Sequence, residues 1–370
     1  NTIPLKGHGV HTYEHLRAVA AAFYASGNPM LYDALKNYLR KIDKMIVPSG
    51  APVGDEWIGG TDADATDRGY EYCSLHELLH SYSSLFIKTA DLRFPDAEEK
   101  IFFNAAQGAR RQDGSCIAYL KTDNSYQMTG GLNGNSSVKQ TRYKYSPAHQ
   151  DAAVCCVPNA GRIAPYFIQN MWVKSNDTLI AALLGPCEVN TMVNGLRIHI
   201  IENTGYPYTN AVSFEVYGEK LEFTLKIRIP SWAEKFSVST FYREENGYIV
   251  VRKKWSGRQI VRIEFSPQVV VHEDNKRDYY FTYGALVLAA PVKATETVTR
   301  SFPLPGFHDY YYTPEKKIIY QYKKQKAGQT ALGKMLVKTN LYNPVSRKTE
   351  TVYLKPVGET ILRQVTFPAQ

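Results

Sequence analysis

The sequence predicts a multidomain α+β protein in which a helical part is followed by β-sandwich structure. Before about residue 175, apolar residues recur at three- and four-residue steps in several segments. After that point, short strand-like runs bounded by Gly, Pro, Asn and Asp dominate. The 370 residues suffice for two or three domains. We expect a helical unit over 1–175, a β-sandwich over 176–290, and a smaller β-unit or extension over 291–370.

The helical part contains five segments with one apolar face each. The predicted helices cover 10–24, 31–42, a stretch from 74 to about 86, 95–107, and about 160–173. The third helix is expected to begin at Ser74, because Glu77 three residues later completes a capping box. The preceding segment, 47–69, is a long loop rich in Gly, Pro and Asp, and long ordered loops are often functional.

The β part follows from six evenly spaced apolar runs with turn residues between them, which is typical of a sandwich. These runs are LIAALL (179–184), LRIHII (196–201), AVSFEVYG (211–218), LEFTLKIRIP (221–230), GYIVVRKKW (247–255) and QIVRIEF (259–265). Further strand-like runs at 317–323, 334–338 and 351–355 place β structure in the tail.

Composition and charge exclude several classes of protein. No run of 18 apolar residues is present, so no transmembrane helix is expected. The net charge of +9 could favour an acidic polymer such as nucleic acid. However, Lys and Arg are spread along the chain, which favours a solvated surface and no nucleic-acid partner. The first residue is Asn, and no signal-like segment precedes it, so we expect any targeting segment to be removed or to lie outside this sequence.

The cysteines point away from a disulfide scaffold. Their number is odd and the chain is large; they lie at positions 73, 116, 155, 156 and 187. The adjacent pair Cys155–Cys156 indicates a soft metal or redox chemistry. The alternative is that both are buried small apolar residues.

The segment 69–86 contains two competing metal motifs. One is H-E-x-x-H, in which His76 and His80 would share zinc and Glu77 would be the general base of a protease. The extended form of that motif is absent, and a third ligand would have to come from Glu98 or Glu99. Because Glu77 also fits the capping box, we favour packed or solvent-facing histidines here.

The other motif is Glu71-x-Cys73. If this segment is extended, the two side chains point to the same side, just before a helix N-terminus that favours negative charge. The pair Cys155–Cys156 also precedes a predicted helix. One carboxylate and three thiols form a donor set suited to tetrahedral zinc.

Several motifs resemble those of bacterial glycoside hydrolase family 127, the β-L-arabinofuranosidase family. They are GHGV near residue 7, GDEW, RGYEYC, EKIFFNAA and AVCCVPNAGRIAPYF, followed by TGYPY, LKIRIPSWA, GYIVVRKKW and YGALVLAAPV. The similarity runs to about residue 292. The resemblance implies that the helical unit is part of an (α/α)6 barrel, with roughly half of it missing and expected upstream.

The resemblance also implies roles for individual residues. Zinc would be bound by Glu71, Cys73, Cys155 and Cys156, and Cys155 would be the nucleophile. Glu56 in GDEW is the best match for the acid/base, and its neighbour Asp55 could raise the pKa of Glu56 by like-charge repulsion. His8 in GHGV would line the sugar pocket.

The implied activity is retaining hydrolysis of a β-L-arabinofuranoside or a related plant cell-wall sugar, with an oligosaccharide or glycan as substrate. Our hypothesis is that Cys155 loosens from the zinc as it attacks. An inactive zinc-containing glycan-binding homologue is the alternative. The resemblance implies a bacterial protein, and it leaves open whether that protein is periplasmic, secreted or cytoplasmic.

Overall fold

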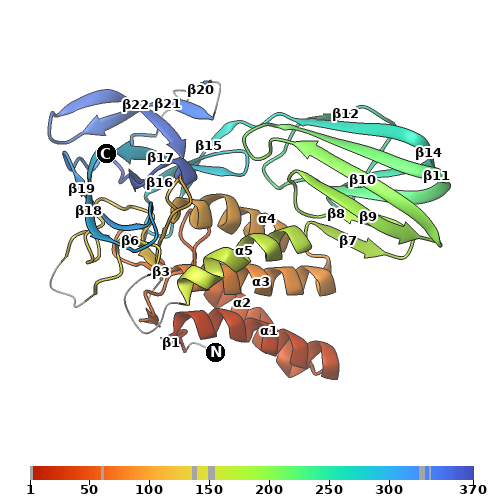
Figure 1. Ribbon diagram of the computed structural model, residues 1–370, viewed down its shortest axis with the longest axis horizontal. Coiled ribbons are helices and arrows are strands. Elements are labelled where there is room, and N and C mark those ends of the chain that lie inside the picture. Colours follow the sequence, from red (N-terminus) through yellow and green to blue (C-terminus); the bar gives the residue numbers. More distant parts are fainter. Residues whose placement is uncertain (1–2, 60–61, 136–139, 149–154, 325–329, 333–334) are drawn as a thin grey trace.

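The structure is a computed structural model in which helices form one side and strands form the rest (Figure 1). It describes residues 3–59, 62–135, 140–148, 155–324, 330–332 and 335–370. A mixed, strand-rich α and β composition is confirmed. In the described part of the chain, no helix is both long enough and apolar enough to cross a membrane.

The longest buried helix, α3, is the centre of the helical part. The α-helices are α1 (Gly9–Ser26), α2 (Pro29–Asp43), α3 (Tyr72–Thr89), α4 (Arg93–Lys100) and α5 (Cys156–Gln169). Helix α3 packs against α1, α4 and α5. Thirteen of its eighteen residues are buried, including polar ones. A side chain on α3 therefore faces neighbouring helices on almost every side.

The predicted capping box is wrong. Helix α3 begins at Tyr72, and Ser74 lies inside it, buried and without a side-chain partner among the described residues. Strand β3 (Tyr70–Glu71) pairs with β5 (Leu120–Lys121), and the Tyr72 amide donates to Tyr119 O at 3.0 Å. This tertiary pairing sets the start of the helix and overrides the local capping pattern.

Two other helices differ from the prediction at their ends. The segment predicted as 95–107 is α4 followed by a π-helix, η1 (Ile101–Ala106). The side chain of Asn104 in η1 donates to Ala285 O at 3.0 Å and accepts from Val287 N at 2.7 Å, which ties this turn to the β part. Helix α5 begins four residues earlier than expected and ends at Gln169.

An eight-stranded sheet follows α5. Its strands are β7 (Trp172–Ser175), β8 (Thr178–Ala181), β9 (Cys187–Val193), β10 (Leu196–Thr204), β11 (Ala211–Arg228), β12 (Phe236–Val238), β13 (Arg243–Glu245) and β14 (Tyr248–Phe265). The long strands β11 and β14 pair along their length, with an irregularity between Glu219 and Leu221. Before it β11 pairs with β10, and after it β11 runs parallel to β8. The two halves of strand β11 thus pair with different strands.

The remaining strands return to the helical part. A seven-stranded sheet contains β15 (Val269–Glu273), β16 (Tyr279–Tyr283), β17 (Leu286–Val292), β20 (Thr330–Leu332), β21 (Leu336–Asn343), β22 (Lys348–Pro356) and β23 (Leu362–Gln364). A four-stranded sheet joins β18 (Ala294–Ser301) and β19 (His308–Pro314) to β6 (Tyr145–Ser146) and β4 (Ile117–Ala118). A domain limit at 290 would cut β17, and the three domain ranges stay a prediction.

A fully buried arginine connects the last strand to the helical part. Arg363 on β23 donates to Asp123 O at 3.0 Å, to Gly108 O at 2.7 Å and to the Tyr70 hydroxyl at 3.1 Å. Tyr70 precedes Glu71 on β3, so Arg363 links β3, in the first third of the sequence, to the C-terminal strand β23.

Candidate metal centre

Four of the predicted site residues meet at the N-terminal ends of α3 and α5. One ligand atom from each of Glu71, Cys73, Cys155 and Cys156 lies within 4.8 Å of the other three. The Cys73 Sγ is 3.1 Å from the Sγ of Cys155 and 3.1 Å from the Sγ of Cys156. The Glu71 Oε1 is 3.5 Å from Cys156 Sγ and 3.8 Å from Cys155 Sγ. The quartet expected from E-x-C and C-C therefore converges.

The elements that position the quartet differ from the expected ones. Glu71 ends strand β3, whereas Cys73 lies in the first turn of α3. The extended-segment argument is thus wrong for Cys73, although the convergence holds. The Cys73 amide also donates to the Cys156 sulfur at 3.4 Å, so an N–H group of the first turn of α3 contacts the cluster.

Burial distinguishes one cysteine from the rest. Glu71, Cys73 and Cys156 are fully buried, whereas Cys155 is exposed. The Tyr119 hydroxyl lies 3.4 Å from Cys155 Sγ. Cys155 is therefore the residue of the quartet that is accessible to solvent.

The close sulfurs share one negative charge. Hydrogen bonds from Cys156 and Cys73 lower the pKa of Cys155 to about 2, and the bond from Tyr119 acts in the same direction. The pKa of Cys73 is raised chiefly because it donates to Cys155, and burial raises the pKa of Cys156. Burial, reinforced by the charge on Cys155, raises the pKa of Glu71 to about 7. A bound cation would stabilise the negative charge that these closely spaced groups share.

The residues fit a bound zinc ion. All three thiols are free, and the donor set of one carboxylate and three sulfurs is one that tetrahedral zinc accepts. The second oxygen of Glu71, Oε2, is buried and has no hydrogen-bond partner within the described residues. A buried acceptor without a partner costs free energy, and a metal ion would remove that cost.

The predicted acid/base and sugar-pocket residues lie beside this cluster. Strand β1 (Gly7–His8) pairs with β2 (Trp57–Ile58), which brings His8 next to Glu56 with 3.3 Å between Nε2 and Oε2. Ligand atoms of His8, Glu56 and Glu71 also lie within 4.8 Å of one another. Burial, and then the neighbouring His11, lower the pKa of His8.

The backbone at Glu56 is strained. Its φ of 80° lies in the left-handed region, which is uncommon for a residue with a side chain. The Gly9 amide donates to Glu56 O at 2.8 Å and helps to hold this conformation. Such strain costs free energy and clusters at functional sites, which supports a special role for this carboxylate.

Two residues that the sequence did not single out complete the site. Arg142 forms an ion pair with Glu56, and its guanidinium lies 4.8 Å from the centroid of the Tyr119 ring. Because Tyr119 contacts Cys155, a continuous path joins Glu56 to the exposed sulfur. Arg142 and Tyr119 lie in the polar, Gly-rich stretch 108–150, which carries no motif, so no local signal could have identified them.

Asp55 does not act on Glu56 in the way expected. Its carboxylate accepts from the Tyr143 hydroxyl at 3.3 Å, and burial raises its pKa. The direct charged partner of Glu56 is Arg142, whose positive charge favours the ionised carboxylate.

The H-E-x-x-H residues do not converge on one point. Both ring nitrogens of His76 are buried without hydrogen-bond partners among the described residues, and burial lowers its pKa to about 4. The Tyr166 ring lies edge-on to His76 at 4.7 Å and to His80 at 4.5 Å, between centroids. Glu77 forms an ion pair with Arg17 at 2.6 Å.

The two proposed third ligands are also engaged elsewhere. Glu98 accepts from the Ser83 hydroxyl at 2.5 Å, and Glu99 forms an ion pair with Arg228. Within the described residues, no group of converging ligand atoms includes the two motif histidines. The structure therefore gives no support to a zinc-protease site here.

Comparison with known proteins supports the fold. Residues 178–266 match the family described as β-L-arabinofuranosidase, GH127 middle domain. A GH127 β-L-arabinofuranosidase from Geobacillus stearothermophilus T6 aligns over 98% of this chain and 59% of its own, at 17% identity and a TM-score of 0.70. No curated protein matches the chain by sequence.

Two further solved structures agree. One, described as a GH127 β-arabinofuranosidase, covers 100% of this chain and 61% of its own, at 16% identity and a TM-score of 0.66. The other, described as a glycoside hydrolase, covers 98% and 66%, at 16% identity and a TM-score of 0.71. The chain thus spans about three-fifths to two-thirds of the length of the structures whose fold it shares.

Proposed function

We propose that this chain is a member of glycoside hydrolase family 127 and takes part in retaining hydrolysis of a β-L-arabinofuranoside or a related plant cell-wall sugar. The match of residues 178–266 to the middle domain of that family and the shared fold support this proposal. The observation that carries the proposal is the cluster of Glu71, Cys73 and Cys156 around the one exposed thiol, Cys155. The helical part would then be a portion of an (α/α)6 barrel, and its glycan substrate would enter beside α3 and α5.

Zinc fits the quartet and would supply a fixed positive charge that keeps the thiols deprotonated. Glu71, Cys73 and Cys156 are buried and suited to holding the ion. Cys155 differs because the residue is exposed and its sulfur lies 3.4 Å from the Tyr119 hydroxyl, whose hydrogen bond lowers the pKa of the thiol. It is therefore the group suited to attack a bound sugar.

In the first step, Cys155 Sγ attacks the anomeric carbon, and the bond from that carbon to the leaving oxygen breaks. Glu56 gives its proton to this oxygen. In the second step, Glu56 takes a proton from water, the water oxygen bonds to the anomeric carbon, and the carbon–sulfur bond breaks. Two displacements on one carbon retain its configuration.

Arg142 sets a condition on this sequence. Its ion pair with Glu56 favours the ionised carboxylate, which suits the base in the second step. The first step needs a proton on Glu56, so substrate binding must displace Arg142 or weaken the pair. The exposed Trp57, whose ring lies 5.7 Å from that of His8, offers an apolar face to a sugar at this point.

A trapping experiment tests the proposal. Glu56→Gln removes the proton donor, so a poor leaving group is not expelled, whereas an activated aryl furanoside should still react in the first step. A glycosyl adduct should then accumulate because no base activates water. Mass spectrometry of the digested protein should find one added sugar on the peptide that carries Cys155. An adduct on a carboxylate would refute the thiolate mechanism.

The ion pair between Arg142 and Glu56 also favours a second candidate function, a zinc-containing glycan-binding protein without turnover. In that case zinc would be retained and a furanoside would bind, but no furanoside in a screen of plant-wall oligosaccharides would be cleaved. Arg142→Gln distinguishes the two, because freeing Glu56 should raise turnover only in an active enzyme.

A further inference from the structure

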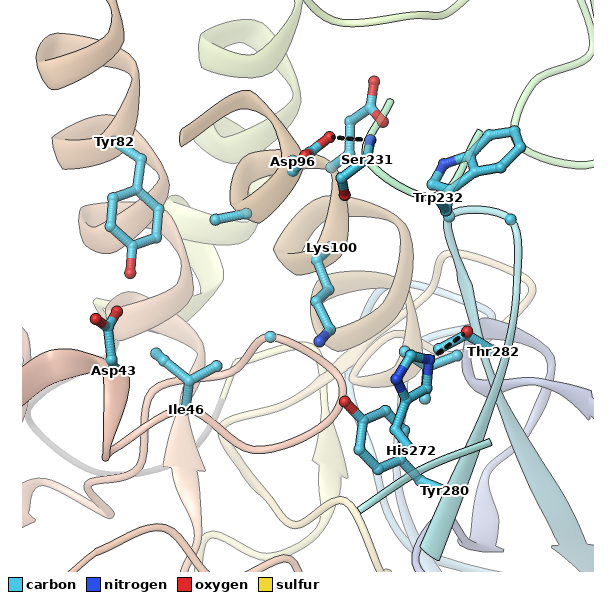
Figure 2. A pocket seen from close by; sticks show the side chains of 16 residues that line it. Asp43, Ile46, Tyr82, Asp96, Lys100, Ser231, Trp232, His272, Tyr280 and Thr282 are labelled. Carbon is cyan, nitrogen blue, oxygen red and sulfur yellow. Dashed lines mark hydrogen bonds between the residues drawn. The ribbon is translucent and has the colours of Figure 1, made fainter. Parts of the chain in front are cut away.

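A pocket of about 390 Å³ lies between the helical part and the seven-stranded sheet (Figure 2). Its walls come from the ends of α2 and α4, from α3, from a turn at residues 231–232, and from β15 to β17. This volume falls within the range of small-molecule sites, about 300–1,000 Å³. None of the residues of the candidate metal centre lines it, so the two sites are separate.

The pocket contains an unpaired cation. The side chain of Lys100 extends from the last turn of α4 toward His272 and Tyr280 (Figure 2). In the part of the chain that the structure describes, its amine has no hydrogen bond or ion pair, and it lies 5.7 Å from the centroid of the Tyr280 ring. Burial lowers the pKa of Lys100, while the charge of Asp123 opposes that shift. Lys100 is partly exposed and lines the pocket, so its amine is accessible to an anionic group of a ligand.

The acidic side chains deepest in the wall do not serve as that anion. Asp96 and Glu99 both form ion pairs with Arg228, which is fully buried. Asp96 also accepts from the Ser231 amide. Their charges are therefore compensated. Lys100 and Asp43 are the other charged side chains in the described lining of the pocket, and the Asp123 carboxylate also acts on Lys100.

Other polar groups line the pocket around this cation. His272 Nε2 lies 2.8 Å from the Thr282 hydroxyl, and burial together with the charge of Lys100 lowers the pKa of His272. The imidazole is thus neutral near pH 7, with its other nitrogen available. On the opposite side, the Tyr82 hydroxyl and the Asp43 carboxylate point toward each other (Figure 2). Such groups are suited to hydroxyls of a ligand.

We propose that this pocket binds a small polyhydroxylated carboxylate, of which a hexuronic acid is the simplest example. The carboxylate would pair with the Lys100 amine, and the hydroxyls would contact His272, Tyr82 and Asp43. A carboxylate can form an ion pair with the Lys100 amine, which a neutral sugar cannot do. The site does not depend on the proposed hydrolase activity.

The test is calorimetric titration of D-glucuronate into the full chain, with D-glucose and inorganic phosphate as comparison ligands. Glucuronate should bind with a Kd of about 1 mM or tighter, and the other two at least about 10-fold more weakly. Lys100→Met keeps the length of the side chain and should weaken glucuronate binding about 10-fold or more. Lys36→Met, at an exposed lysine on α2, is the matched control and should change nothing.

A second variant protects the test against a folding defect. Tyr82→Phe removes only a hydroxyl and should weaken glucuronate binding a few-fold, about 5-fold. Unchanged binding in Lys100→Met, or glucose binding as tightly as glucuronate, would overturn the carboxylate site. Phosphate binding as tightly as glucuronate would overturn the role of the hydroxyls. Cys155→Ser should bind glucuronate normally, and loss of binding there would overturn the independence of the two sites.

Discussion

Helix α3 carries two sets of metal-ligand residues that are close in sequence and very different in structure. At its N-terminus, Cys73 meets Glu71 and two cysteines from α5, and their ligand atoms crowd within 4.8 Å. One turn later, His76 and His80 have the spacing of a known zinc motif, yet their rings are separated by 6.3 Å between centroids and pack on Tyr166.

The difference lies in the partners, not in the motif. The cysteine set takes its ligand atoms from β3, α3 and the start of α5, and the buried Oε2 of Glu71 has no hydrogen-bond partner among the described residues. In the histidine set, Glu77 is already paired with Arg17. A metal site needs ligand side chains from several segments of the chain that converge on one point. A five-residue motif on one helix supplies ligands from only one such segment.

The largest effect is expected from replacing Cys155, the exposed residue of the cysteine set. Cys155→Ser should lower turnover of an aryl β-L-arabinofuranoside at least about 1,000-fold, because a hydroxyl ionises far less readily than a thiol. Steady-state kinetics on a protein that contains the complete catalytic domain measure this. Cys187→Ser, at a thiol outside the centre, is the control and should keep full activity. Full activity in Cys155→Ser would leave zinc with a structural role only.

The next effect concerns the metal itself. Cys73→Ser should weaken zinc binding by at least about 10-fold, as seen when zinc-site partners are removed. Metal analysis after dialysis against a graded chelator measures the affinity. Added zinc should partly restore activity to Cys73→Ser but not to Cys155→Ser.

The matched control lies in the histidine set. The double variant His76→Asn, His80→Asn should retain the zinc of the unmodified chain. Loss of zinc from this variant would reverse the comparison and favour the H-E-x-x-H site.

A smaller effect is expected at Glu77. Glu77→Gln removes the charge that pairs with Arg17, which still donates to Glu77 O and the Ser81 hydroxyl. The free energy of unfolding should fall by about 1–2 kcal/mol, with unchanged zinc content. Urea denaturation at neutral pH checks it. A variant that is as stable as the parent but has lost zinc would assign Glu77 to a metal.

The smallest effect is expected at His76. Replacing it with Leu removes two buried nitrogens without partners in the described structure, so stability at pH 7 should rise by about 1 kcal/mol. Because burial lowers the pKa of His76 to about 4, the unfolded chain binds a proton between pH ~6.5 and 4 that the folded chain does not. The parent should therefore lose stability as the pH falls through this window.

His76→Leu cannot titrate, so its loss of stability over the same window should be shallower. Denaturation at several pH values tests this, with His15→Leu on the exposed face of α1 as the control. Equal pH dependence in parent and His76→Leu would show that His76 already has a proton partner, most directly Glu77 at 3.7 Å.

The sequence predicted most residues of the candidate site, but the local structure that was expected to bring them together was partly wrong. Glu71, Cys73 and the pair after residue 154 were identified by residue type and by resemblance, and their side chains do converge. The helix start was misplaced because the pairing of β3 with β5 involves a segment about fifty residues away, with Tyr70 opposite Lys121. No local pattern reports such a contact.

The fold divides in the same way. Five helices and the strand-rich second part follow from apolar periodicity, which is a local property. The π-helix at 101–106 and the parallel pairing of β8 with β11 depend on contacts made after the chain has folded. Arg142 and Tyr119 were missed for the same reason, because neither belongs to a motif.

The buried Arg363 has a consequence for the order in which the molecule is made. Its bond to the Tyr70 hydroxyl joins residues 293 positions apart, next to the first ligand of the cysteine cluster. Contacts of such long sequence separation form late, since the loop between them must close first. During synthesis, β3 emerges long before its anchor. Until β23 docks, the thiols of the cluster therefore belong to a partly folded chain, in which they are open to oxidation.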